Sequence, residues 1–68
     1  MKIIQRQLNG YLIAKREWIS QNDDYNIQHF GITKDTYNKI SKVCSDLYGT
    51  SGDRLILADI NRRLVNEN

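Results

Sequence analysis

The chain has very few of the residues that usually hold small proteins together. It contains one cysteine, one histidine and no proline in 68 residues. A single cysteine excludes an intramolecular disulfide. One cysteine and one histidine also cannot supply the Cys/His ligand set of a structural zinc site. We therefore expect no disulfide framework, no metal ion and no other cofactor.

Long apolar runs are missing as well. No stretch approaches the ~20 consecutive apolar residues that span a bilayer. Residues 1–7, MKIIQRQ, lack the apolar region of a signal peptide. Together with the single cysteine, these absences lead us to expect a protein of the reducing cytoplasm that has no membrane contact.

The composition is nevertheless that of a folded protein, because 40% of the residues are hydrophobic and 26% are charged. Residues 1–68 are too few for more than one domain. A domain of this size buries only about 60% of the surface that its unfolded chain exposes. It therefore needs either a compact helical core or a partner chain. We expect one all-α domain that assembles as a homodimer.

Apolar residues recur at helical spacing in three segments. This pattern predicts three helices, over residues 4–21, 34–48 and 53–65. A short additional helix is expected over residues 23–30. Gly10 is a weak point in the first helix, because glycine inside a helix costs about 1 kcal/mol relative to alanine.

Capping residues mark the ends of these segments. Gly31 suits the left-handed conformation that often ends a helix. Thr33 is a good N-cap for the helix that follows it, and Gly49 stands where that helix should end. Ten side chains fall on the inward faces and are assigned to the core: Leu12, Trp18, Phe30, Tyr37, Ile40, Cys44, Leu47, Tyr48, Ile60 and Leu64. For Trp18 and Tyr48 an interface position is the alternative.

The third predicted helix carries apolar residues on two sides. Leu55, Ala58 and Val65 follow the spacing of a coiled-coil seam, which Arg62 interrupts. Either the helix lies between the other two, or this second side meets another chain. Ile13 stands opposite the apolar stripe of the first helix in the same way. These five residues are the candidate dimer or partner interface.

Catalysis has little support in the sequence. Any Ser-His-Asp arrangement would have to use His29, and no Gly-x-Ser-x-Gly motif is present. The glycines of residues 48–53 are not followed by the Lys-Ser/Thr of a phosphate-binding loop. Cys44 falls on an apolar helix face, where a small buried thiol is the simpler interpretation. We expect a protein that is not an enzyme and has no catalytic residues.

DNA recognition is the alternative function. Residues 26–42 resemble a helix-turn-helix, with a short helix, a turn containing glycine and a capped second helix. Two observations count against it: Ile27 stands where close helix packing favours alanine, and Asp23 and Asp24 bring negative charge near the backbone. In this alternative, two kinds of position would meet DNA: Lys34, Asp35, Thr36 and Asn38 in the major groove, and Lys39 and Lys42 on phosphates.

Three segments give the chain a resemblance to the ANR family, the small AraC negative regulators of enteric bacteria. They are Leu12-x-Ala14-x-x-Glu17-Trp18, the run from His29 to Thr33 (HFGIT), and Leu47-Tyr48-Gly49-x-x-Gly52-Asp53-Arg54-Leu55-Ile56. Their order and spacing carry the resemblance, and they extend over most of the chain from Leu12 to Arg63.

The resemblance implies a helical, self-associating negative regulator of transcription that represses virulence regulation. Such a protein would bind an AraC/XylS-type activator directly and block its dimerisation or its binding to DNA. Binding to a nucleoid-associated protein is a further implied partnership. A protein that binds through a helix needs an apolar helix face that is not already buried in its own core. We expect the five candidate interface residues to supply this face.

Overall fold

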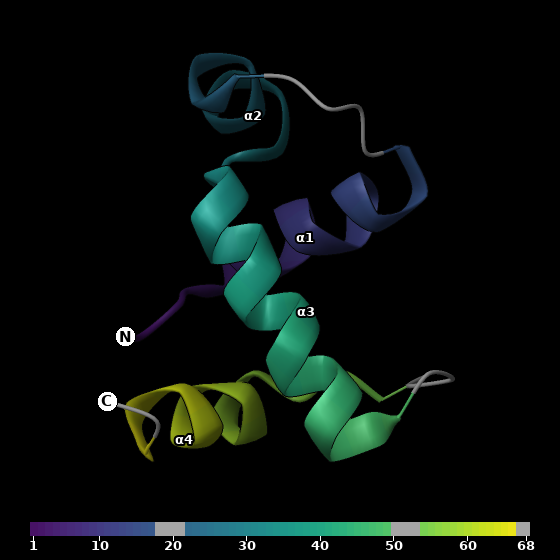
Figure 1. The fold of residues 1–68 in the computed structure, drawn as a ribbon, viewed down its shortest axis with the longest axis vertical. Coiled ribbons are helices and arrows are strands. Elements are labelled where there is room, and N and C mark those ends of the chain that lie inside the picture. Colours follow the sequence, from purple (N-terminus) through teal and green to yellow (C-terminus); the bar gives the residue numbers. More distant parts are fainter. Residues whose placement is uncertain (18–21, 50–53, 67–68) are drawn as a thin grey trace.

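The structure is a computed structural model that describes residues 1–17, 22–49 and 54–66. Within these ranges the chain is all-helical apart from short connections. The helices are α1 (Gln5–Glu17), α2 (Asp23–Phe30), α3 (Lys34–Tyr48) and α4 (Leu57–Asn66). In Figure 1, α3 runs through the middle of the molecule, with α2 at one end, α4 across the other and α1 alongside. The expected all-α fold is confirmed. None of the helices described is long and apolar enough to cross a membrane.

The inward side of α1 consists of Leu8, Gly10, Tyr11 and Ala14. Gly10 lies against the backbone of Phe30, the last residue of α2. A Cβ on Gly10 would overlap the Phe30 carbonyl oxygen and lie 2.9 Å from its carbonyl carbon. Gly10 is therefore the point at which α1 and α2 approach each other closely, and treating it only as a weak point of the helix was wrong.

This approach also changes which residues of α1 are buried. Tyr11 and Ala14 are 3% and 0% exposed, whereas Leu12 is 39% exposed, so the core assignment of Leu12 is wrong. Because successive helical residues are ~100° apart, turning Gly10 and Tyr11 inward turns Leu12 outward. Trp18 and the expected end of the first helix at residue 21 lie outside the described residues.

The turn between α2 and α3 follows the capping pattern of the sequence. The side chain of Asn22 accepts a hydrogen bond from the N–H of Tyr25 at 2.9 Å and begins α2. Gly31 ends α2 with φ 79°, in the left-handed region. Thr33 then caps α3, because its Oγ1 accepts the N–H of Thr36 at 3.1 Å. The predicted roles of Gly31 and Thr33 are confirmed.

α3 contributes the centre of the core, where Ile40 and Val43 are fully buried, and Gly49 ends this helix as expected. Leu47 is 43% exposed, so its core assignment is wrong. It lies on the last turn of α3, where it lines a surface hollow together with residues of α4. The other core assignments within the described ranges divide into buried residues, namely Phe30, Ile40, Cys44, Ile60 and Leu64, and partly buried ones, Tyr37 and Tyr48.

α4 begins later than the sequence suggests, at Leu57 rather than residue 53, and residues 54–56 are not helical. The Tyr48 hydroxyl accepts the N–H of Ile56 at 3.1 Å. The carbonyl of Ile56 in turn accepts the N–H of Ile60 at 3.0 Å, which is the first bond of the helix. A side chain from α3 therefore fixes the residue at which α4 begins.

The two ends of the described chain are joined by Asn61. Its side-chain oxygen accepts the N–H of Ile3 at 2.7 Å, and its side-chain nitrogen donates to the carbonyl of Ile3 at 3.0 Å. The Ile3 side chain is 1% exposed and belongs to the core. The non-helical residues 1–4 are thus held against α4, a contact that the helical pattern did not predict.

Candidate functional site

Three of the predicted interface residues share the outward side of α4. Ala58, Arg62 and Val65 are exposed, with Val65 at 55%, whereas Ile60 and Leu64 on the opposite side are buried. Their spacing of four and three residues places them along one side of the helix. We call these three residues the α4 face. Its two apolar members are small, and its one charged member is an arginine.

Leu55 does not belong to the α4 face. It precedes the helix, and its half-buried side chain packs against the core. The coiled-coil seam that the sequence suggested is therefore wrong at this position, because α4 begins two residues after Leu55. The structure leaves a shorter face of three residues.

Ile13 is exposed, at 50%, on the outer side of α1. It lines a hollow of about 240 Å³ together with Leu12, Arg16 and Glu17. All the described residues that line this hollow belong to α1, so it is a surface separate from the α4 face. Leu12, which the sequence placed in the core, contributes to this outer surface.

A further hollow of about 320 Å³ adjoins the α4 face. Leu47 of α3 supplies its apolar side chain, and Arg62 belongs both to the hollow and to the α4 face. Arg62 pairs with Asp59 at 3.3 Å and Arg63 pairs with Asp46 at 3.5 Å. Sequence reasoning missed Leu47 as a surface residue, because its helical position alone points toward the core.

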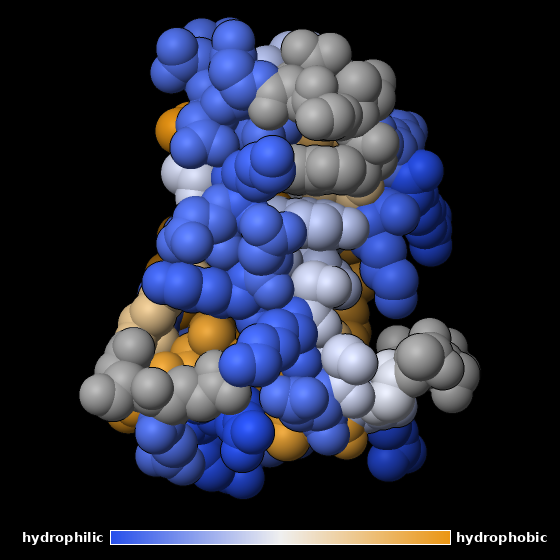
Figure 2. Space-filling view, viewed as in Figure 1, coloured by the Kyte–Doolittle hydropathy of each residue, from blue (hydrophilic) through white to orange (hydrophobic). Residues whose placement is uncertain are grey.

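The residues proposed for DNA contact lie along α3. Lys34, Asn38, Lys39 and Lys42 are exposed on its outward side, and Figure 2 shows a hydrophilic surface over the middle of the molecule, where α3 runs. Thr36 does not join them. It is partly buried and its hydroxyl lies 3.0 Å from that of Thr33, so it is less accessible than these four residues.

Carboxylates offset the lysines of this surface. Asp23 accepts the backbone N–H of Lys34 at 3.0 Å, so the positive end of the α3 dipole already has an anion beside it. Lys39 pairs with Asp35 at 3.2 Å. Asp23 and Asp35 thus place negative charge beside Lys34 and Lys39.

Groups suited to catalysis or metal binding do not converge in the part of the chain that is described. No three His, Cys, Asp or Glu side chains there could hold a metal ion. His29 packs against the rings of Tyr25 and Phe30, with ring centroids 5.1 and 4.8 Å apart. Cys44 is a buried free thiol on the inward side of α3.

No family model, no curated protein sequence and no solved structure matches this chain.

Proposed function

We propose that this protein is a negative regulator of transcription that binds an AraC/XylS-type activator by helix packing and blocks its dimerisation or its binding to DNA. The identity of the partner class rests on the resemblance to the ANR family. The α4 face is the surface proposed to meet the activator. A homodimer and a nucleoid-associated partner belong to the same proposal.

The α4 face is the observation that carries the proposal. Ala58 and Val65 lie outward on a helix whose other side is anchored by Ile60 and Leu64 in the core. A partner helix can therefore pack on a surface that is already ordered, which lowers the entropic cost of association. Arg62 between them is of the residue type most often found, with tryptophan and tyrosine, at energetically dominant interface positions.

The alternative of direct DNA binding has weaker physical support. Affinity for DNA comes largely from lysine and arginine contacts that release phosphate counterions. On the outward side of α3, Asp35 pairs with Lys39, and Asp23 lies at the N–H of Lys34. Asp23 also occupies the amide end of α3 that would approach a phosphate. A surface of this kind attracts a polyanion poorly.

Val65→Asp tests the proposal. Val65 is 55% exposed, so the change should leave the fold intact. A carboxylate in place of an apolar side chain of the contact should weaken co-purification with the activator by at least about tenfold, or ~1.4 kcal/mol. The measurement is the amount of activator retained by tagged protein, with circular dichroism as the check on folding.

Asn38→Asp is the matched control, because it adds the same charge at an exposed position on α3. Retained activator should not change in this variant. The proposal is contradicted if Val65→Asp retains as much activator as the unmodified protein, or if Asn38→Asp alone abolishes repression in a reporter strain.

A further inference from the structure

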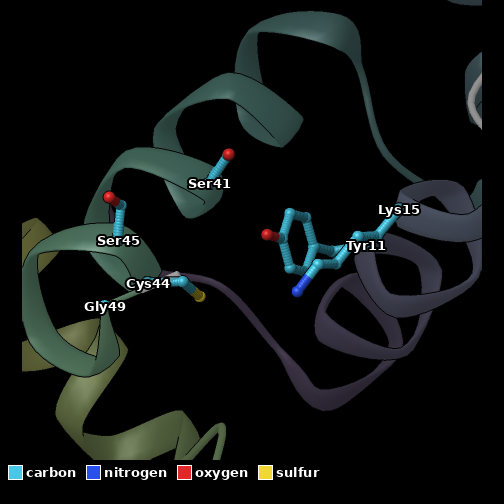
Figure 3. Close-up of a pocket in the computed structure, with 6 residues that line it drawn as sticks. All are labelled: Tyr11, Lys15, Ser41, Cys44, Ser45 and Gly49. Carbon is cyan, nitrogen blue, oxygen red and sulfur yellow. The ribbon is translucent and has the colours of Figure 1, made fainter. Parts of the chain in front are cut away.

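A hollow between α1 and α3 is separate from the surfaces described so far. It has a volume of about 230 Å³ and is lined by Tyr11 and Lys15 of α1, by Ser41, Cys44 and Ser45 of α3, and by Gly49. Figure 3 shows the side chains of Tyr11, Lys15 and Cys44 pointing into the gap between the two helices. The helical pattern gave no sign of this convergence, because the residues come from segments about thirty positions apart.

Every polar side chain among the described lining residues can donate a hydrogen bond. These residues supply one ammonium, three hydroxyls and one thiol, and none of them carries a carboxylate. A lysine ammonium has three donors and no acceptor, so its best partner is an anion. We infer that the α1–α3 hollow binds a small organic carboxylate, with Lys15 as the charge partner and the hydroxyls of Tyr11 and Ser41 as further donors.

The size of the hollow sets the size of the ligand. A volume of about 230 Å³ corresponds to roughly eight water molecules at ~30 Å³ each. Sites for drug-sized ligands begin near ~300 Å³. A carboxylate with a short aliphatic chain therefore fits, with its carboxylate toward Lys15 and its chain toward the Tyr11 ring and Gly49.

The protonation of the two inner groups suits an anion. Burial raises the pKa of the Tyr11 hydroxyl above its ordinary value of 10.0, and burial likewise raises the pKa of the Cys44 thiol above 9.0. Both groups are therefore neutral near pH 7 and do not repel a carboxylate. The Tyr11 hydroxyl interacts with both the Ser41 hydroxyl and the Cys44 thiol. Because sulfur is a weak acceptor, a carboxylate can compete with the thiol for the Tyr11 donor.

This inference does not depend on the proposed function. A ligand in the hollow would touch both α1 and α3 and favour the folded state according to its concentration. It would give the protein a means of responding to small organic acids through a surface other than the α4 face.

Butyrate, with butyramide as its neutral counterpart, tests the site. Titration of the ¹⁵N-labelled protein with butyrate should give saturable amide shifts, with a millimolar Kd, at residues of both α1 and α3 that line the hollow. Lys15→Gln should weaken butyrate binding about tenfold, because it removes one charge-assisted contact. Butyramide should bind at least about tenfold more weakly than butyrate for the same reason.

Lys42→Gln is the matched control. It removes the same charge from an exposed position of α3 outside the hollow, and butyrate affinity should stay within about twofold. The inference is overturned if butyrate gives no saturable shift at millimolar concentration, or if butyramide binds equally well. It is also overturned if Lys15→Gln and Lys42→Gln weaken binding to the same extent.

Discussion

Gly10→Ala is expected to destabilise the protein by about 3 kcal/mol, the upper part of the range for overpacking a tight contact. The added methyl would overlap the carbonyl oxygen of Phe30 and lie 2.9 Å from its carbonyl carbon. Backbone atoms cannot move aside as the end of a flexible side chain can, so α1 and α2 would have to separate. A domain of this size has ~3–10 kcal/mol of stability in total, so much of it would be lost.

The direction of this stability change distinguishes Gly10 from a glycine inside an ordinary helix. Inside an ordinary helix, replacing glycine by alanine stabilises by about 1 kcal/mol. Thermal unfolding should instead show a midpoint lowered by roughly 12–24 °C. Asn9→Ala, at the exposed neighbouring position, serves as the control and should change stability by less than about 0.5 kcal/mol. A midpoint that rises in Gly10→Ala would show that α1 and α2 do not meet at Gly10.

Asn61→Ala should have the second largest effect on stability, about 2 kcal/mol. It removes two hydrogen bonds to the backbone of Ile3, at 2.7 and 3.0 Å, and each such bond contributes ~1 kcal/mol net. Residues 1–4 would lose their attachment to α4, and the apolar side chain of Ile3 would lose its place in the core. Hydrogen exchange should then show loss of protection at the Ile3 amide.

Two further variants make this result specific. Asn61→Asp keeps the oxygen that accepts from Ile3 but sets a second carboxylate oxygen against the Ile3 carbonyl, so this variant should be no more stable than Asn61→Ala. Asn66→Ala, at an exposed position of the same helix, should be nearly neutral. An Ile3 amide that stays protected in Asn61→Ala would contradict the described contact.

Local signals predicted much of this fold. The left-handed conformation at Gly31 and the N-cap at Thr33 depend on neighbouring residues only. The bounds of the helix over residues 34–48 follow from the caps at its two ends and from one continuous apolar stripe. The all-α class follows from helical spacing throughout the chain.

Contacts between distant residues could not be predicted in this way. Ile3 and Asn61 are 58 positions apart, and neither has a sequence signal that points to the other. The outward turn of Leu12 depends on the contact between Gly10 and Phe30, which periodicity does not reveal. The start of α4 depends on the Tyr48 hydroxyl, and for this reason Leu55 was wrongly placed on a helical seam.

The candidate site was predicted only in part. The periodicity of the third predicted helix gave Ala58, Arg62 and Val65 correctly as one side, because that side depends only on residue spacing. The hollow beside it could not be predicted, since Leu47 is inward by helical angle but is 43% exposed in the structure, where it lines the hollow with residues of α4. The carboxylate of Asp23 at the start of α3 was likewise a tertiary contact.

The central claim is that this protein acts on an activator protein and not on DNA. The most direct measurement is a gel-shift titration of a promoter bound by an AraC-type activator. We predict that added protein releases the promoter from the activator, that Val65→Asp does not, and that the protein alone shifts no DNA even at low salt. A shift by the protein alone that weakens steeply as salt rises, with the activator still bound, would contradict the claim.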